Sequence, residues 1–286
     1  MTGMTGFGAP NGDRSYPPRA GEPPARGPGP GIRGLREPPA VSLAPGAAVG
    51  LESVTKVYGS GARAVTALDR VTIAFAAREF TAIMGPSGSG KTTLLQVAAG
   101  IDRPTSGQVR LGDTELGHMS ERRLTVLRRR RIGFVFQSFN LMGSLTAEQN
   151  VALPLRLDGR RPKAKVVREA LARVGLDGRA RHRPGELSGG QQQRVAIARA
   201  LVTRPEVIFA DEPTGALDPH TAVGVLRLLR GAADGTTVVI VTHDPQVTRF
   251  CDRAVFLRAG RVDRVLDDPE PAVVARVLHE LGERGL

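Results

Sequence analysis

The segment that most constrains the fold is the glycine-rich stretch Gly85-Pro86-Ser87-Gly88-Ser89-Gly90-Lys91-Thr92-Thr93. Residues 80–84 before it form an apolar run that predicts a buried strand, and residues 94–99 after it predict a helix. Between a strand and a helix, such a loop brings backbone amides and a helix N-terminus to one point, where they attract phosphates. An ordinary glycine-rich turn would not require all of these spacings. We therefore predict a nucleoside triphosphate site, with Lys91 on the β and γ phosphates and the Thr92 hydroxyl on Mg²⁺.

The rest of the chain predicts an α/β fold. Strands are expected at residues 51–58, 71–75, 80–84, 107–111, 132–136, 207–210 and 236–241, with a hairpin at 255–257 and 260–262. Helices are expected at residues 94–99, 120–131, 163–174, 191–202, 221–229 and 271–281. Residues 145–183 are expected to be helical, with Pro154 cutting the helix that contains residues 150–153. Gly175 and Ser188 occupy positions typical of a helix C-cap and N-cap.

The ends of the chain differ in composition. Residues 1–50 contain 11 Gly and 10 Pro, so residues 1–46 are predicted to be a disordered tail, with a Pro-rich docking segment as the alternative. Residues 47–286 are predicted to form one folded domain. The single cysteine, Cys251, excludes an internal disulfide and favours a reducing compartment, with a small buried side chain expected rather than a reactive thiol. We expect neither a membrane span nor a signal peptide, because long apolar runs are missing.

The formal net charge of +12 is concentrated in two segments. Residues 121–131 carry six arginines against Glu121, and residues 156–183 carry ten basic residues against three acids. A nucleic-acid groove is one interpretation, and a solvated basic face or a face near anionic lipid headgroups is the other. Aromatic residues make up 4% of the chain and do not interleave with these arginines, so base stacking has little support. We therefore expect no nucleic-acid partner.

Two further segments supply chemistry that the phosphate loop lacks. Asp211 and Glu212 directly follow the apolar run 207–210, at the strand end where ligands bind in parallel sheets. Asp211 is suited to hold Mg²⁺ through its water shell and Glu212 to polarise the attacking water, although a carboxylate pair could also simply cap the next element. Ser188-Gly189-Gly190-Gln191 at a helix start predicts a second anion site, which suggests that two chains share two nucleotides.

Together, Gly85–Thr93, Leu187–Gln191 and Asp211–Glu212 resemble the nucleotide-binding subunit of ATP-binding-cassette (ABC) transporters, over about residues 48–265. The resemblance implies a P-loop NTPase fold of the ABC ATPase type. This α/β fold has a mostly parallel core sheet, an N-terminal antiparallel β subdomain and a helical subdomain, here about residues 138–186. It also implies ATP and Mg²⁺ as cofactors and an ATPase reaction. The residues that match the remaining family motifs are Tyr58, Gln137, Asp218 and His243.

Each of these matches implies a role. Tyr58 is expected to stack on adenine, although a surface tyrosine at a strand end is the alternative. Gln137 is expected to reach Mg²⁺ and the water and to sense the membrane partner. Asp218 is expected at the dimer interface and His243 on the γ-phosphate. The catalytic set implied is therefore Glu212, His243, Gln137 and Lys91.

Residues 135–142 and 211–218 are similar to the macrolide-export and lipoprotein-release subgroup. This similarity implies a stand-alone ATPase that forms an ATP-dependent head-to-tail dimer with a second copy. It also implies an integral-membrane permease as partner, a peripheral location at the cytoplasmic face of the cell membrane, and export. The alternatives are the ATPase of a mechanotransmission or cell-division membrane complex and a non-transport cassette that acts on nucleic acid. The cargo leaves no signal in this sequence.

Overall fold

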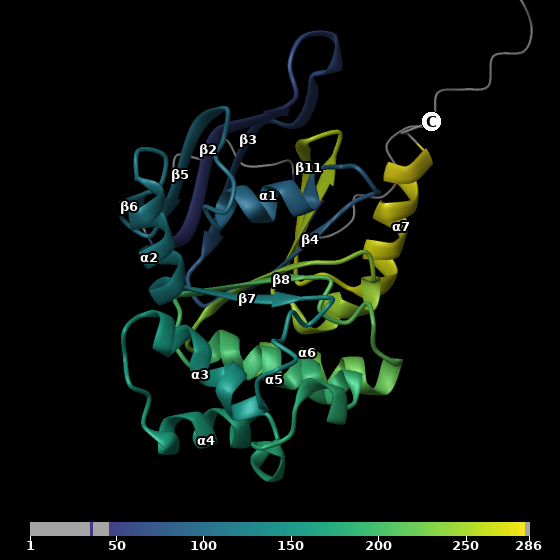
Figure 1. Ribbon diagram of the computed structural model, residues 1–286. Coiled ribbons are helices and arrows are strands. Elements are labelled where there is room, and N and C mark those ends of the chain that lie inside the picture. Colours follow the sequence, from purple (N-terminus) through teal and green to yellow (C-terminus); the bar gives the residue numbers. More distant parts are fainter. Residues whose placement is uncertain (1–34, 37–45, 284–286) are drawn as a thin grey trace, which may run out of the picture. The chain divides into compact units, whose positions relative to one another are not determined.

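The computed structural model describes residues 35–36 and 46–283, and within these residues the strands form two sheets (Figure 1). The larger sheet has the strand order β1-β11-β10-β4-β9-β8-β7. Its strands are β1 (Leu35–Arg36), β4 (Phe80–Met84), β7 (Ile132–Phe136), β8 (Val207–Asp211), β9 (Thr237–Val241), β10 (Arg253–Arg258) and β11 (Arg261–Asp267). The smaller sheet, in the order β3-β2-β5-β6, consists of β2 (Ala47–Tyr58), β3 (Val65–Ala76), β5 (Ser106–Leu111) and β6 (Thr114–Glu115).

Helices connect many of these strands. The α-helices are α1 (Lys91–Ala98), α2 (Glu121–Arg131), α3 (Ala147–Leu157), α4 (Ala164–Arg173), α5 (Gly189–Leu201), α6 (Pro219–Ala233) and α7 (Pro271–Glu283). Short 3-10 helices occur at Gly61–Arg63, Asp177–Arg179, Pro184–Glu186 and Pro245–Phe250. No helix in the described ranges is long and apolar enough to cross a membrane.

The centre of the larger sheet is parallel and buried. Strands β10, β4, β9, β8 and β7 pair in parallel, and every residue of β4 and β9 is buried. Continuous apolar runs such as these suit strands that are covered on both faces. The register aligns Ile83 and Asp211 with Val241, and Phe136 with Asp211, so the segments after β4, β7, β8 and β9 leave the sheet at one edge. That edge carries the candidate site.

Helix α1 lies between the two sheets (Figure 1). Its buried residues Leu94, Leu95, Val97 and Ala98 belong to one core cluster with residues of both sheets. The helix therefore connects the phosphate loop rigidly to the core. The second sheet is antiparallel along its length. The predicted combination of a mostly parallel core sheet, an N-terminal antiparallel sheet and a helical part is confirmed.

Helices α3 to α6 gather on the far side of β7 and β8 from α1 (Figure 1). The prediction that Pro154 cuts its helix is wrong, because α3 continues through Pro154 to Leu157. Proline removes one amide donor and crowds the carbonyl four residues earlier, but the helix keeps a capping box between Thr146 and Gln149 and a buried face that includes Val151. These contacts outweigh the loss of a single backbone hydrogen bond.

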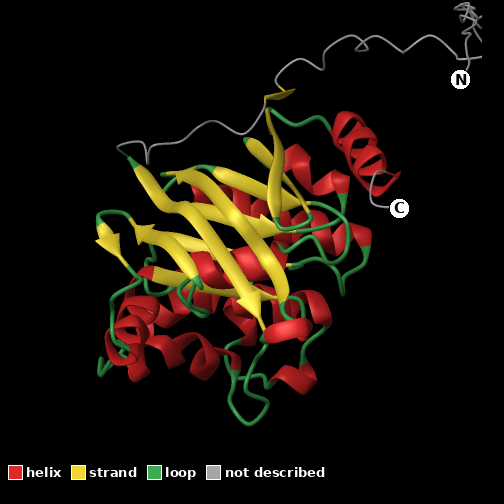
Figure 2. Cartoon of the chain, turned by 90° about the horizontal axis from the view of Figure 1, so that it is seen from above, coloured by secondary structure: helices red, strands yellow, loops and turns green. Residues whose placement is uncertain are grey.

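Other local predictions are confirmed. Ser188 caps α5, and Gly175 follows α4 with a positive φ of 72°. Helix α7, beside the strands in Figure 2, forms where a helix was expected at residues 271–281 and buries Val274, Val277 and Leu281. The predicted disordered tail lies largely outside the described residues. The exceptions are Gly46, in a turn before β2, and β1, which pairs with β11 and so places two residues of that segment in a sheet.

Candidate functional site

The phosphate loop joins β4 to α1 with three glycines in conformations that other residues avoid. The φ angles of Gly85, Gly88 and Gly90 are 149°, 75° and 98°. A Cβ atom on Gly85 would lie 2.2 Å from the carbonyl oxygen of Leu257, and one on Gly90 would lie 2.4 Å from that of Ala67. Glycine at these two positions is therefore required by close backbone approach as well as by φ.

Lys91, at the start of α1, folds back over this loop. Its Nζ donates to the carbonyl oxygens of Pro86 (2.8 Å) and Gly85 (3.1 Å). Burial lowers the pKa of Lys91, and the nearby carboxylates of Glu212 and Asp211 oppose that shift. The ammonium group thus lies at the loop, close to two acids.

The loop fits a polyphosphate. The Ser89 hydroxyl is buried and has no hydrogen-bond partner among the described residues. The N-cap of α1 is Gly90, which offers no side chain to the first amides of the helix. Buried polar groups and helix N-terminal amides require acceptors, and phosphate oxygens supply them. The same loop therefore offers both donors and positive charge to one anion.

The acidic pair lies across from this loop. Burial raises the pKa of Asp211 and the adjacent Glu212 raises it further, whereas Lys91 and a hydrogen bond with the Thr92 side chain lower it. Asp211 and Thr92, two of the predicted Mg²⁺ ligands, therefore meet. The described residues contain no group of three or more His, Cys, Asp or Glu side chains that could hold a metal. Mg²⁺ suits such a site, because it binds through few protein oxygens together with water and phosphate.

Glu212 pairs with His243. Oε1 of Glu212 lies 2.8 Å from Nδ1 of His243, and the side chains are 20% and 76% exposed. Glu212 has a φ of 45°, and its amide donates to the carbonyl of Val241 at 2.9 Å. A left-handed conformation at a residue with a Cβ is strained and persists only where the surrounding structure holds it. The carboxylate is thus held beside an exposed imidazole.

Gln137 follows β7 at the same edge and is exposed. Its Nε2 lies 2.9 Å from the position that a Cβ on Gly215 would take, so the amide packs against the loop that leads to Asp218. Among the described residues, no hydrogen bond joins Gln137 to Asp211 or Thr92. The structure therefore places Gln137 next to the acidic pair without engaging it.

Tyr58 ends β2 and is 39% exposed. Its hydroxyl donates to Oδ2 of Asp102 (2.8 Å), and Nζ of Lys56 lies 4.8 Å from its ring centroid. Burial raises the pKa of the Tyr58 hydroxyl and the hydrogen bond to Asp102 raises it further, whereas a hydrogen bond with Thr93 lowers it. Tyr58 is therefore fixed beside the first turn of α1. The sequence analysis missed Lys56 and Asp102, since neither belongs to a motif.

The segment Ser188 to Gln191 forms the first turn of α5. The Ser188 hydroxyl accepts from the Gln191 amide (3.3 Å), and the Ser188 amide donates to Oε1 of Gln191 (3.1 Å). Gly189 lies near Leu217, and a Cβ on Gly190 would lie 2.2 Å from Cγ2 of Thr221. This turn therefore packs against the segment that contains Asp218.

Asp218 caps α6. Its Oδ1 accepts from the Thr221 amide (3.0 Å), and hydrogen bonds with Thr221 hold the pKa of Asp218 below its usual range. In the described part of the chain, no hydrogen bond or ion pair links Ser188–Gln191 or Asp218 to the phosphate loop. The predicted site residues thus form two groups, one around Lys91 and one around Ser188.

The fold and the first group define a P-loop nucleotide-binding protein, since a phosphate loop, an acidic strand end and a histidine meet at one edge of a parallel sheet. The family model described as ABC transporter matches residues 68–215. The chain is 45% identical over 224 residues to a lipoprotein-releasing system ATP-binding protein, LolD 1, of Rhodospirillum rubrum, covering 76% of this chain and 98% of that protein. The chain therefore belongs to the ABC transporter family and is an ATP-binding, ATP-hydrolysing cassette.

Solved structures agree with this assignment. The cassette MJ0796, a protein of Methanocaldococcus jannaschii, has a dimeric post-hydrolysis structure with ADP and phosphate. That structure superposes with a TM-score of 0.71 at 44% identity and covers 77% of this chain and 98% of its own. A macrolide export ATP-binding/permease protein, MacB, of Hyphomonas neptunium is 45% identical to this chain over 218 residues. The aligned region covers 74% of this chain and 33% of that longer protein.

Proposed function

We propose that the chain is the ATP-hydrolysing subunit of an exporter, which drives a separate membrane permease by ATP-gated dimerisation. The observation that carries the proposal is the division of the site residues into two groups. Lys91, Asp211 and Glu212 lie together, whereas Ser188 and Asp218 lie together elsewhere. A second copy, placed head to tail, would bring its Ser188 group to the first copy's ATP. The dimeric structure of the related cassette supports this arrangement.

Within each site, the proposed roles follow from chemistry. Lys91 and the amides of Gly85 to Thr93 bind the phosphates, and Tyr58 stacks on adenine. Glu212 accepts a proton from the attacking water, and His243 holds that carboxylate in place and contacts the γ-phosphate. Thr92, Asp211 and Gln137 would hold Mg²⁺, which would neutralise charge that develops on the phosphates. Ser188, Gly189, Gly190, Gln191 and Asp218 serve the site of the other copy.

ATP then acts as a ligand that favours the closed dimer, because it contacts both copies. ADP and phosphate lack that bridge once the bond to the γ-phosphate is broken. A ligand shifts a conformational equilibrium only by its differential affinity for the two states. Hydrolysis therefore reopens the dimer, and the cycle can do mechanical work on a partner bound to the helical part.

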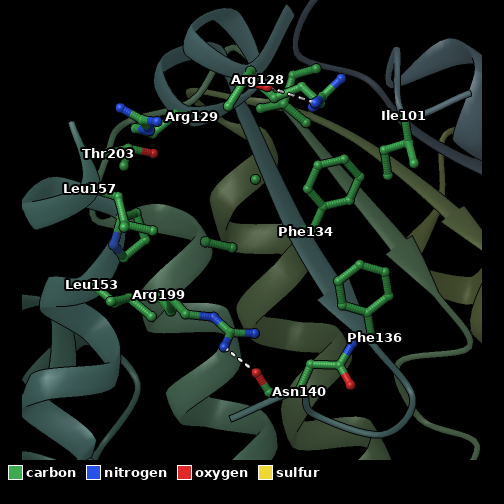
Figure 3. Close-up of a pocket in the computed structure, with 15 residues that line it drawn as sticks. Ile101, Arg128, Arg129, Phe134, Phe136, Asn140, Leu153, Leu157, Arg199 and Thr203 are labelled. Carbon is green, nitrogen blue, oxygen red and sulfur yellow. Dashed lines mark hydrogen bonds between the residues drawn. The ribbon is translucent and has the colours of Figure 1, made fainter. Parts of the chain in front are cut away.

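A groove beside Gln137 supports a permease as that partner. It has a volume of about 510 Å³ and runs between β7 and helices α2, α3 and α5 (Figure 3). Phe134, Phe136, Leu153 and Leu157 make it apolar, and arginines from α2 and α5 also line it. An amphipathic cytoplasmic segment of a permease, with acidic groups facing the arginines, matches this lining. The MacB relative carries a permease within its own chain, which favours the same occupant.

Docking through this groove would place the chain at the cytoplasmic face of the membrane. Export is favoured by the lipoprotein-releasing and macrolide-export relatives. The basic helix α2 is partly neutralised within the chain, since Arg130 pairs with Asp158 (2.8 Å) and Arg131 with Glu206 (2.6 Å). This pairing weakens the nucleic-acid alternative, because paired arginines are less available to phosphates.

The catalytic proposal is tested with Glu212→Gln. We expect this variant to bind ATP and to dimerise on ATP addition, with turnover reduced by at least a hundredfold, because it cannot accept the water's proton. The matched control is Glu270→Gln, which makes the same change at an exposed glutamate just before α7. Gel filtration with ATP and a phosphate-release assay give the two readouts. Wild-type turnover in Glu212→Gln would show that Glu212 is not the catalytic carboxylate.

The docking proposal is tested with Leu157→Arg, at a groove residue that is 60% exposed. We expect this variant to lose sedimentation with membranes that contain the permease, while the isolated cassette keeps its ATPase activity. Val166→Arg is the control, since Val166 on α4 is 41% exposed and does not line the groove. Equal sedimentation of the Leu157 variant and the wild type would place the partner elsewhere.

A further inference from the structure

Arg199 is a half-buried cation near the C-terminal end of α5. Its two terminal nitrogens donate to neighbouring backbone carbonyls, Nη1 to Asn140 (2.5 Å) and Nη2 to Phe139 (3.0 Å). No ion pair joins Arg199 to a carboxylate among the residues that the structure describes. Partial burial against carbonyls alone disfavours the charged form, and this desolvation lowers the pKa of Arg199. We therefore look for the role of Arg199 in the backbone segment that its guanidinium holds, rather than in a contribution to overall stability.

The two carbonyls belong to residues in left-handed conformations. The φ angles of Phe139 and Asn140 are 60° and 47°. Left-handed backbone is unfavourable for a bulky residue such as Phe139 and less so for Asn140, so a contact that holds both carbonyls stabilises this turn. The planar fork of a guanidinium bonds the two carbonyls through two separate nitrogens in a fixed geometry, whereas a lysine would have to reach both from a single Nζ. Arg199 therefore supplies the restraint for this turn.

This turn lies directly after Gln137. The Phe139 amide donates to the carbonyl of Phe136, the last residue of β7, at 3.2 Å. Further along, the side chain of Asn150 bonds both backbone groups of Met142. Hydrogen bonds to Phe136 and to Asn150 thus hold the segment between β7 and α3 near both of its ends. Gln137 is joined to α5 through that segment.

Arg199 is also part of the groove beside the turn. Figure 3 shows its guanidinium directed toward the Asn140 carbonyl, with Leu153 nearby. Whatever fills the groove therefore meets this hydrogen bond. At its other end, α5 begins with the cap at Ser188. A single helix thus connects the groove with the segment proposed to reach the second copy's ATP.

We propose that Arg199 is a positioning residue that joins the Gln137 turn to helix α5, so that groove occupancy, Gln137 and Ser188 change position together. This inference rests on the proposed function, because the groove occupant and the shared ATP site come from it. Arg199 touches neither ATP nor water in this scheme. Arg199 keeps the turn in its left-handed conformation. Because Arg199 belongs to α5, a movement of the turn also moves Ser188 at the start of this helix.

The test compares Arg199→Met with Arg199→Lys and with Arg194→Met in the full chain. Arg194 is the matched control, since it lies on the same helix and bonds one carbonyl, that of Val174 (3.4 Å), away from the Gln137 turn. We expect kcat of Arg199→Met to fall by tenfold or more with KM for ATP within about threefold, because the phosphate loop is unaffected. Arg199→Lys is expected in between, and Arg194→Met within twofold of wild type.

A second measurement separates positioning from folding. Asn140→Gly makes the left-handed conformation inexpensive, so adding it to Arg199→Met is expected to restore most of kcat. Thermal unfolding of each variant records stability. Unchanged kcat in Arg199→Met would overturn the proposal, as would a loss that follows thermal stability and is not rescued by glycine. If Arg199→Met does not fold, wild-type kcat in Arg199→Lys overturns it.

These outcomes are independent of the catalytic proposal. Glu212→Gln reports on turnover and ATP-driven dimerisation whether or not Arg199 matters. If Glu212→Gln behaves as expected and Arg199→Met hydrolyses ATP normally, only the role of Arg199 is lost. If Glu212→Gln keeps turning over, the site assignment itself is wrong.

Discussion

Nδ1 of His243 lies 2.8 Å from Oε1 of Glu212, although the two residues are 31 positions apart in the chain. The sheet creates this proximity, because β8 and β9 are parallel neighbours and Asp211 is in register with Val241. The Glu212 amide extends the ladder by donating to the Val241 carbonyl. Both side chains therefore leave the same edge on adjacent strands, and His243 can hold the carboxylate proposed to act on water.

Removing that contact with His243→Ala is expected to lower kcat by roughly 10–100-fold, the equivalent of one hydrogen bond to a charged group, about 1.5–3 kcal/mol. ATP binding should change little, because Lys91 and the phosphate loop remain. Steady-state phosphate release and equilibrium ATP titration check this. His118→Ala is the control, since the His118 side chain is 90% exposed. Weakened ATP binding with unchanged kcat would contradict a role in holding Glu212.

The sequence predicted the parts of the site that depend on local pattern. The phosphate loop, the acidic strand end and the Ser188 cap each need a short segment with fixed spacing, and the structure forms all three. The helix through Pro154 could not be predicted in this way, because its continuation depends on a buried face. The two strands at Phe80–Met84 and Ile132–Phe136 were predicted to the residue, since a charged residue precedes each apolar run and Gly85 or Gln137 follows it.

Contacts between residues that are far apart in the chain could not be predicted from the sequence. Arg199 belongs to an amphipathic helix, and nothing in its neighbours shows that it reaches Asn140, 59 positions away. Lys56 and Asp102 likewise meet at Tyr58 only after β2 and the loop after α1 come together. The division of the site into two groups was anticipated from the second anion site at Ser188. Only the structure shows that the segment Ser188 to Gln191 packs against Leu217 and Thr221.

Gly190→Ala is expected to destabilise the first turn of α5. The new methyl group would lie 2.2 Å from Cγ2 of Thr221, so the helices must shift, at a cost of about 1–3 kcal/mol for overpacking. ATP-driven dimerisation should fall, while ATP binding by one copy persists. Adding Thr221→Ser removes the clashing methyl and keeps the hydroxyl, so it should restore stability. Urea unfolding and gel filtration with ATP provide the measurements. Restored stability without restored dimerisation would show that the second site itself needs glycine.

Ionised Asp252 is expected to contribute to the free energy of unfolding, and this contribution is expected to disappear at acidic pH. Burial alone would raise the pKa of Asp252, but the Arg230 guanidinium (2.6 Å) and the Phe80 amide (2.9 Å) outweigh it and hold that pKa below its ordinary value. A carboxylate with a depressed pKa contributes stability above the unfolded-state pKa of about 4, and this is lost as pH falls through the folded-state value.

Asp252→Asn should therefore lower the free energy of unfolding at pH 7 by roughly 1 kcal/mol, a figure reduced for the partial exposure of the pair. The difference from wild type should shrink below about pH 4. Urea titrations across pH 2.5 to 7 measure it, with the exposed Asp113→Asn as control. A difference that grows on acidification would show that Asp252 does not stabilise the fold in its ionised form.

Asn150 carries the buried polar network that shapes the segment after Gln137. Its side chain is fully buried, accepts from the Met142 amide (2.8 Å) and donates to the carbonyls of Met142, Leu145 and Thr146 (3.1 Å each). Asn150→Ala leaves buried backbone groups unpaired, so the free energy of unfolding should fall by about 2–4 kcal/mol. Gln149→Ala, which breaks only the capping box of the same helix, should cost about 1 kcal/mol or less. Denaturant unfolding compares the two. Equal losses would mean that the segment is held chiefly by its helix cap and not by the Asn150 side chain.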